Sequence, residues 1–533
     1  MPRNSGTALA RNALVAITAA SLLGSCSLTL EFEECRQDSD CNNEAGEDLV
    51  CNLDTNTCEP RPVPADVLCE DPEPCTSVFG EESTCGPDGE CALLTNEQCT
   101  KVVFPDGADP DEIVWIGSIL ATSEPFTEAI APIENAIELA LDDFNSVTSL
   151  SDGKKVGWIA CDSGGSPSAA EEAARHLIED VGVPAIIGPT LSEEVLALQP
   201  LVVDTNTFVV TPTATAAAIG GLDDNGLIWR TISSDAVQAN AIADRIASLD
   251  PPPESILVLA KNDEYGKGLF EPMLGRLSEV LPNVPTGSLL YPNPVGLSED
   301  DARSAYATVI ADGFAQNADT IVFLGTSEVT EVLNAYLLAW NGSGMQLPRF
   351  VMSHGAVPEL LPSLQLVVES FRPTLMNALE GVSPNIQDPE NFEDFNIRYR
   401  VVYSDLNPLS ASPLGYDAAI VTLMGLVAGG ASGVEIATAM PRLADATGGT
   451  PVPMGSQQAL IDARELLVAG GNIDIGGVSG PLDFDLVNGE ISSTYVGWDV
   501  VPVTAGSPDG QLQAARAYVL DGAGPTGSWV EVE

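Results

Sequence analysis

Residues Ala185–Ala218 read AIIGPTLSEEVLALQPLVVDTNTFVVTPTATAAA, and this stretch decides the fold. It predicts a short apolar strand, a turn that contains Gly188 and Ser192, a helix, a second apolar strand and a turn rich in threonine. The spacing allows both turns to lie on one edge of a parallel sheet, where helix N-termini present unpaired backbone N–H groups. These N–H groups would act together with nearby side-chain hydroxyls, and the pattern therefore predicts a binding site for a carboxylate or another small anionic group. The hydroxyls belong to Ser192, Thr211, Thr213 and Thr215.

The rest of the chain from about residue 111 alternates apolar strands with amphipathic helices. We expect Pro132 in the first turn of one helix, and Ser168 with Glu171 as the capping box of the next. This alternation predicts an α/β fold with two lobes, each a parallel sheet covered by helices on both faces, and a cleft between them. The expected strands are Ile113–Leu120, Val156–Cys161, Pro184–Ile187 and Phe208–Val210, then Ser255–Ala260, Thr286–Tyr291, Thr320–Leu324 and Arg349–Met352.

Length and charge narrow the classes of function. The 533 residues exceed what one hydrophobic core usually holds, which favours several domains. The formal net charge of −56 repels phosphate backbones and excludes a nucleic-acid partner. We find no Asp-rich twelve-residue loop with calcium-ligand spacing, so we predict no metal and no cofactor.

The N-terminus carries an export signal. Residues 1–25 contain Arg3 and Arg11, followed by an apolar run that is too short to span a bilayer. The sequence Leu23-Gly24-Ser25-Cys26 resembles a bacterial lipobox, which implies cleavage before Cys26 and lipid on that residue; the alternative is a plain signal peptide. We therefore expect membrane attachment through the N-terminal lipid only, and a location in the cell envelope, either in the periplasm or at the outer membrane or cell surface.

Of the ten further cysteines, nine mark a separate module over residues 26–99. Eight of them form a repeat of roughly 34 residues in segments with almost no aliphatic side chains, which need cross-links to hold them. Disulfides are favoured over zinc because CxxC is absent, and each repeat leaves three pairings open. We expect the ninth and tenth, Cys99 and Cys161, to bridge the module to the large domain. The repeated cysteines are Cys35, Cys41, Cys51 and Cys58, then Cys69, Cys75, Cys85 and Cys91. The module serves either as a protease-resistant stalk or as a docking element.

The order of motifs resembles the type I periplasmic binding proteins, in particular the leucine/isoleucine/valine-binding and receptor-ligand-binding group. The resemblance rests on Ile187-Gly188-Pro189, Thr211-Pro212-Thr213-Ala214-Thr215, Arg230-Thr231, residues 262–268 (NDEYGKG), Asp319–Phe323 and Tyr416-Asp417-Ala418. It implies two Rossmann-like lobes joined by three crossovers, near 231–235, 380–386 and 474–480. The first lobe then comprises 111–232 and 383–476, and the second comprises 233–382 and 477–533. Residues 480–485 (GPLDFD) resemble the closing strand of the second lobe.

The same resemblance implies a ligand site. Ser192, Thr213 and Thr215 match positions that hold the carboxylate of an amino acid, and Tyr265 matches a second-lobe residue facing the cleft. Where amino-acid-binding members have an acid for the ammonium group, this chain has His354, and Ser327 stands at an often aromatic position. Glu264 or Glu328 could supply the acid, and His354 could instead be a packing residue. Amides, urea and aromatic acids are alternative ligands, with Ser123 and Phe126 as further lining candidates.

We predict a binding protein and not an enzyme, because GxSxG, HExxH and a complete phosphate-binding loop are missing, and His176 reads as a surface residue. The leading hypothesis is a lipid-anchored solute-binding protein that captures a small carboxylate-bearing ligand by lobe closure for an ABC permease. The alternatives are a ligand-binding receptor or scavenger without a transporter, and a structural surface lipoprotein with a vestigial cleft.

Overall fold

The computed structural model describes residues 49–52, 57–60, 63–385, 388, 391–403, 410–445, 447–491, 493–521 and 525–531. The signal segment, Cys26, Cys35 and Cys41 therefore lie outside the described residues. The chain divides into two compact units, residues 1–63 and 64–533. The first unit contains a hairpin of β1 (Leu49–Asn52) and β2 (Thr57–Pro60), in which Cys51 and Cys58 occupy opposed register positions.

The second cysteine repeat belongs to the larger unit and is not a separate stalk. Its elements are a 3-10 turn (Pro64–Asp66), α1 (Glu73–Phe79), β3 (Ser83–Cys85) and β4 (Cys91–Leu93). Disulfides join Cys69 to Cys85 and Cys75 to Cys91. The sulfurs of Cys69, Cys75 and Cys91 lie within 4.8 Å of one another, and all three are engaged in these bridges. The disulfide interpretation is therefore confirmed for this repeat, and zinc is not needed to explain it.

The first lobe is built on a six-stranded sheet with the order β10-β9-β8-β6-β7-β5. Its core strands are parallel, as the alternating pattern predicts, and β5 pairs antiparallel with β7 at one edge. The expected bridge Cys99–Cys161 joins these two strands. The strands are β5 (Cys99–Val103), β6 (Ile113–Leu120), β7 (Lys155–Asp162), β8 (Ala185–Ile187), β9 (Phe208–Thr211) and β10 (Ile228–Arg230).

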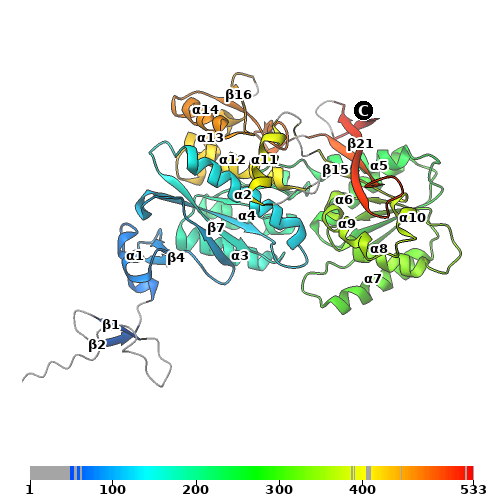
Figure 1. Ribbon diagram of the computed structural model, residues 1–533, viewed down its shortest axis with the longest axis horizontal. Coiled ribbons are helices and arrows are strands. Elements are labelled where there is room, and N and C mark those ends of the chain that lie inside the picture. Colours follow the sequence, from blue (N-terminus) through cyan, green and yellow to red (C-terminus); the bar gives the residue numbers. More distant parts are fainter. Residues whose placement is uncertain are drawn as a thin grey trace, which may run out of the picture. The chain divides into compact units, whose positions relative to one another are not determined.

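Helices cover both faces of this sheet because its strands alternate their side chains between two cores. In β7, Trp158 packs with one core and Ile159 with the other. One face carries α2 (Thr127–Val147), α12 (Ser412–Ala428), α13 (Gly433–Leu443) and α14 (Gln457–Val468); the other carries α3 (Pro167–Arg175) and α4 (Ser192–Thr205) (Figure 1). The remaining elements are α11 (Phe392–Val402), a π-turn (His176–Val181), 3-10 turns at Pro110–Glu112 and Ile219–Gly221, β16 (Thr450–Pro453), β17 (Ile473–Gly476), β18 (Phe484–Asp485) and β19 (Glu490–Ile491).

The second lobe has an eight-stranded sheet with the order β12-β11-β13-β14-β15-β20-β21-β22. The first five strands are parallel, and the last three form an antiparallel meander. The strands are β11 (Ile256–Lys261), β12 (Thr286–Tyr291), β13 (Thr320–Leu324), β14 (Arg349–Met352), β15 (Leu379–Pro384), β20 (Tyr495–Pro502), β21 (Gly510–Leu520) and β22 (Gly527–Glu531). Both sheets are thus mostly parallel but mixed.

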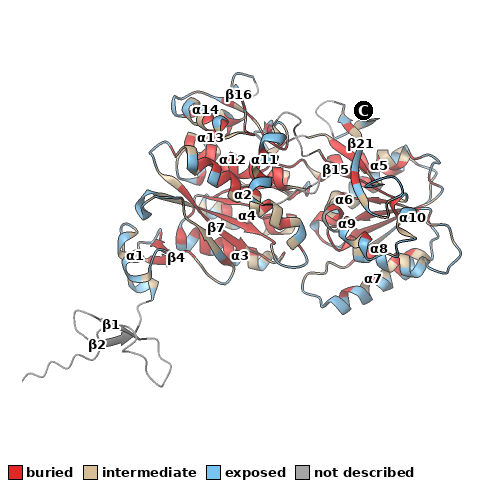
Figure 2. Cartoon of the chain, in the orientation of Figure 1, coloured by how far each residue is buried: buried red, intermediate tan, exposed pale blue. Residues whose placement is uncertain are grey.

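The second sheet is also covered on both faces. The helices on one face are α5 (Asp235–Ala247) and α6 (Glu264–Val280), and those on the other are α7 (Glu299–Phe314), α8 (Val329–Trp340), α9 (Val357–Gln365) and α10 (Arg372–Met376). A 3-10 turn (His354–Ala356) precedes α9. Figure 2 shows the buried residues concentrated on the strands and on the inner sides of these helices.

Four expectations from the sequence were wrong. Pro132 lies inside α2, which begins five residues earlier, and not in its first turn. The N-cap of α3 is Ser166 and not Ser168, and Pro167 lies in the first turn of that helix. The threonine-rich turn leads to a 3-10 turn and β10 without an intervening helix. His176 is buried: its Nε2 lies 3.3 Å from the Leu94 carbonyl oxygen and its Nδ1 lies 3.0 Å from Asp180 Oδ2. This histidine fastens the second cysteine repeat to the first lobe.

The predicted third crossover is also wrong. Residues 480–485 do not close the second lobe, since β18 pairs with β19, and Phe484 packs edge-on against Trp229 of the first lobe. The buried carboxylate of Asp417 in α12 accepts hydrogen bonds from the backbone N–H groups of Val478 and Ser479, which holds this segment on the first lobe. The chain enters the second sheet only with β20.

Among the described residues, no single helix has the length and apolar character to cross a membrane. Only α12 and α13 taken together meet those criteria, and they are bent by 103°. Every residue of α12 except Ala428 is buried in the first-lobe core.

Candidate ligand-binding site

A cavity of about 540 Å³ lies where the carboxyl ends of the two parallel sheets meet. This is the position at which open α/β sheets bind small molecules. The first lobe contributes residues after β6, β8 and β9, and the second contributes residues after β11, β13 and β14. Ile232 and Pro384, at the first two crossovers, line it as well. Its main lining residues are Phe126, Ile130, Leu191, Ser192, Glu193, Thr213, Asp263, Tyr265, Thr326, Ser327, His354, Val357, Tyr399 and Leu414.

The first-lobe side of the cavity is the start of α4. Gly188, with φ of +107°, makes the turn after β8; a Cβ there would lie 2.2 Å from the Ile119 carbonyl oxygen. Ser192 opens the helix, and its Oγ accepts a hydrogen bond from the Ala216 N–H at 3.1 Å. Its own proton remains available for a ligand. The helix N-terminus and this hydroxyl therefore favour a negatively charged group at this point.

The two threonines predicted beside Ser192 behave differently. Thr213 lines the cavity, but its Oγ1 donates to the Thr190 carbonyl oxygen at 2.9 Å and is left to act as an acceptor. Thr215 is 1% exposed and is not a lining residue of the cavity. The structure thus brings Ser192 and Thr213 to the cavity, whereas Thr215 is buried outside its lining.

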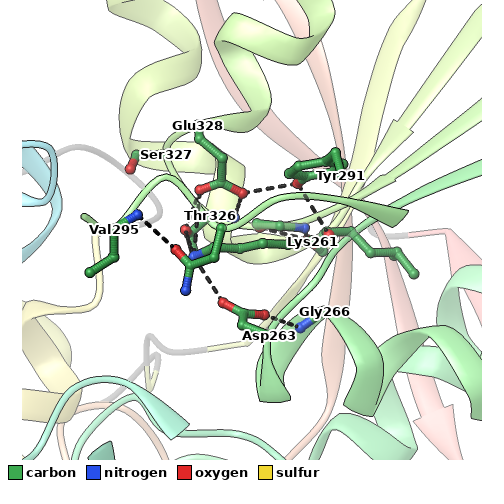
Figure 3. A network of polar contacts seen from close by, with 12 residues as sticks. Lys261, Asp263, Gly266, Tyr291, Val295, Thr326, Ser327 and Glu328 are labelled. Carbon is green, nitrogen blue, oxygen red and sulfur yellow. Dashed lines mark hydrogen bonds and ion pairs between the residues drawn. The ribbon is translucent and has the colours of Figure 1, made fainter. Parts of the chain in front are cut away.

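The second-lobe side is shaped by a buried ion-pair network. The Nζ of Lys261 lies 2.9 Å from Asp263 Oδ2, 3.8 Å from Glu328 Oε2 and 3.1 Å from Thr326 Oγ1 (Figure 3). Although burial opposes ionisation, Lys261 and Thr326 hold the pKa of the Glu328 carboxyl below its ordinary value. Glu328 is therefore committed to Lys261 and does not line the cavity, and Glu264 is exposed and does not line it either.

This network fixes the loop after β13 so that Ser327 faces the cavity. Ser327 is 6% exposed, and its Oγ has no hydrogen-bond partner among the described residues. Figure 3 shows it apart from the dashed contacts around Lys261. A buried hydroxyl without a partner is costly unless a ligand satisfies it.

His354 and Tyr265 complete this side. The Nε2 of Gln238 donates to the Val382 carbonyl oxygen at 3.0 Å, which turns its Oε1 toward His354 Nδ1 at 3.1 Å. The Nδ1 therefore carries the proton and also lies 3.2 Å from the Tyr265 hydroxyl. Burial lowers the pKa of His354 to about 4, so the ring is neutral and its Nε2 can only accept. His354 is thus a cavity-lining residue held in place by two neighbours.

Of the further lining candidates, Phe126 lines the cavity and Ser123 does not. Phe126 is buried and lines the cavity, whereas the Ser123 hydroxyl donates to Asp162 outside it. Sequence reasoning missed Glu193, the second residue of α4, which lines the cavity and accepts a hydrogen bond from Asn293 of the second lobe at 3.2 Å. The only signal was its place next to Ser192, and acids in a first helical turn are common for other reasons.

Solved structures share this fold. A leucine-binding protein from Thermotoga maritima aligns with a TM-score of 0.55 and 18% identity, over 75% of this chain and 98% of that one. A branched-chain amino acid transporter substrate-binding protein from Streptococcus pneumoniae, in complex with isoleucine, gives 0.52 and 15% over 75% and 99%. A solute-binding protein of an ABC transporter from Rhodopseudomonas palustris, in complex with 3,4-dihydroxybenzoic acid, gives 0.54 and 14% over 76% and 96%.

Sequence comparison agrees with the fold. The Leu/Ile/Val-binding protein BraC3 of Rhizobium johnstonii is 26% identical over 180 residues, which cover 33% of this chain and 47% of that protein. The chain thus spans about half the length of this curated relative. The family model described as periplasmic binding protein matches residues 114–458, more than half of the chain. The two lobes and the cavity between their sheets fit this match, and the chain belongs to the periplasmic binding protein family, with the type I fold.

Proposed function

We propose that this protein is an extracytoplasmic solute-binding protein that captures a small carboxylate-bearing molecule by closing its two lobes over it. The observation that carries the proposal is the cavity lined from both lobes at the start of α4. The ligand carboxylate lies against the free hydroxyl proton of Ser192 and the N-terminus of α4. The second lobe then covers the ligand with Tyr265, Ser327 and His354. The role is binding, not catalysis.

A ligand panel tests this function. Amino acids, amides and small aromatic and aliphatic acids are screened by thermal shift. A ligand present at 100 times its dissociation constant adds about 2.7 kcal/mol to the free energy of unfolding. We expect at least one carboxylate to raise the melting temperature, and calorimetry then gives its affinity. A complete panel without a shift contradicts the proposal and favours a structural lipoprotein with a vestigial cleft.

Coupling to an ABC permease is the second part of the proposal. It is supported by two solved solute-binding proteins of ABC transporters that share the fold. Deletion of the gene is expected to abolish uptake of the radiolabelled ligand, and a plasmid copy is expected to restore it. Normal uptake in the deletion strain, combined with tight binding in vitro, would instead identify a receptor or scavenger.

Attachment through lipid on Cys26 is the third part. It is supported by the lipobox resemblance of residues 23–26, and family membership implies an extracytoplasmic location. The wild-type protein should partition with membranes and incorporate labelled palmitate. Cys26→Ser should remove both properties, whereas Ser27→Ala should change neither. A Cys26→Ser protein that stays membrane-bound refutes this part.

A further inference from the structure

A loop of the second lobe makes contact with the first lobe at the start of α4. It comprises residues 292–297 (PNPVGL) and directly follows β12. The side chain of Asn293 bridges the lobes, because its Nδ2 donates to Glu193 Oε1 at 3.2 Å. Val295 is partly buried and packs against the hydrophobic core of the first lobe. The loop therefore supplies one polar and one apolar contact that exist only while the lobes are together.

The loop is held in shape by its own lobe. The backbone N–H of Val295 donates to Asn293 Oδ1 at 3.1 Å, which leaves the Nδ2 of that side chain free to reach Glu193 (Figure 3). Its two prolines restrict the backbone. At its base, the buried hydroxyl of Tyr291 donates to Glu328 Oε1 at 2.9 Å. A preorganised loop loses little entropy when it engages the first lobe, so more of its contact energy favours closure.

Glu193 also meets charged groups of the second lobe, because α4 packs against α6. Burial, and after it the charge of Asp263, raise the pKa of the Glu193 carboxyl. Glu264, in the first turn of α6, acts in the same direction. Lys261 and Asn293 act against it, and the pKa remains above its ordinary value. All four of these residues belong to the second lobe.

The charges near Glu193 do not cancel. Lys261 is paired with Asp263 at 2.9 Å and lies 3.8 Å from Glu328, so these three side chains together carry one net negative charge. On its own helix, Glu193 is followed by the buried Glu194, which stays beside it whether the lobes are open or closed. Separating the lobes therefore removes the second-lobe groups and returns the Glu193 carboxyl to water.

This difference couples a proton to the lobe movement. The Glu193 carboxyl has a higher pKa in the closed protein than in an open one, so the closed form binds the proton more tightly. By linkage, protonation favours closure. The advantage is fully present below the pKa of the open form, and it is lost as the pH rises through the pKa of the closed form.

We propose that residues 292–297 form a clasp that holds the two lobes together, and that Glu193 loosens this clasp as the pH rises. Asn293 and Val295 supply the attraction, and ionised Glu193 supplies the repulsion against Asp263. The inference rests on the lobe closure of the proposed function, but it concerns the equilibrium between open and closed protein and not the identity of the ligand. Ligand release is then faster at neutral than at acidic pH.

Single-molecule energy transfer between the lobes measures this equilibrium in the ligand-free protein. Dyes are attached through p-azidophenylalanine at Asp204 and Asp312, which are exposed on α4 and α7, so that the disulfides stay intact. From about pH 4.5 to about pH 7.5, the ratio of closed to open molecules should fall at least about threefold; one group can change it by at most about tenfold per pH unit.

A variant pair assigns the pH dependence. Glu193→Gln keeps the shape and the contact with Asn293, and its ratio should be the same at both pH values. Glu465→Gln removes one exposed carboxylate from α14 and should keep the wild-type fall. A wild-type ratio that does not change with pH, or an equal fall in Glu193→Gln, overturns the role of Glu193.

A second pair tests the clasp itself. Val295→Ser removes the apolar contact, and it should lower the ratio of closed to open molecules by at least about threefold at both pH values. Leu297→Ser, in the same loop but 44% exposed, should leave the ratio unchanged. Unchanged ratios in both Val295→Ser and Asn293→Ala, with wild-type melting temperatures, overturn the clasp, as does a ligand-free wild type that is entirely open. The proposed function fails instead when no small molecule of the panel binds.

Discussion

Replacing Ser192 with alanine tests the carboxylate end of the site most directly. Its Oγ accepts from the Ala216 N–H at 3.1 Å and keeps its own proton for a ligand. Hydrogen bonds to charged groups contribute roughly 1.5–3 kcal/mol, so affinity for a carboxylate ligand should fall about 10- to 150-fold. The substitution also leaves the buried Ala216 N–H without its acceptor, which should cost about 1–3 kcal/mol of folding stability.

The two effects are measured separately. Calorimetry on folded protein gives the dissociation constant, and urea unfolding without ligand gives the stability. Ser304→Ala is the matched control, because its hydroxyl donates to the Asp300 carbonyl oxygen on the exposed face of α7, far along the chain from the site. It should leave binding unchanged. An unchanged affinity of Ser192→Ala for every carboxylate ligand, at a ligand-free stability lowered as expected, would refute the placement.

Three other perturbations have defined outcomes. Burial raises the pKa values of the Glu194, Asp235 and Asp417 carboxyls to about 7, whereas their values in the unfolded chain are near 4. Between about pH 4 and pH 7 the unfolded chain therefore releases these protons while the folded protein retains them, so folding stability should fall as pH rises. The loss is at most about 1.4 kcal/mol per pH unit for each group. Thermal melts at pH 5.5 and 7.5 should show this loss, and Asp235→Asn should show a smaller one; equal pH slopes would contradict the argument. Replacing both Cys99 and Cys161 with serine should lower stability in urea by about 2–4 kcal/mol, and reductant should then have a smaller effect than on wild type. His176→Ala should speed proteolysis within residues 64–98 without changing ligand affinity; equal cleavage rates would show that this histidine does not hold the repeat.

The strand pattern of the lobes follows from local sequence. Four strands have the predicted bounds, because apolar runs of about four to eight residues between turn residues are too short for most helices and favour strands. They are Ile113–Leu120, Thr286–Tyr291, Thr320–Leu324 and Arg349–Met352. Packing determines instead where α2 begins relative to Pro132, and it also determines which lobe residues 480–485 join. Phe484 belongs to the first lobe because Trp229 is there, and no local signal announces that contact.

The sequence predicted several residues that line one cavity, but it did not predict their hydrogen bonds. Family spacing brought Ser192, Thr213, Tyr265, Ser327 and His354 to one cavity. Whether a hydroxyl there donates or accepts depends on backbone groups far along the chain or across a turn, such as Thr190 for Thr213. The neutrality of His354 depends on burial. These properties arise from tertiary structure, and a sequence pattern does not contain them.

The antiparallel strand β5, with its disulfide to β7 and the buried His176 contact, makes the second cysteine repeat an integral part of the first lobe. The two lobes are therefore mechanically unequal. If the lobes open and close as proposed, we expect the first lobe and the repeat to move as one rigid body, and the second lobe with its antiparallel meander to rotate relative to them. A spectroscopic probe on the repeat would therefore report the position of the first lobe, and a probe on β21 would report the rotation of the second lobe relative to it.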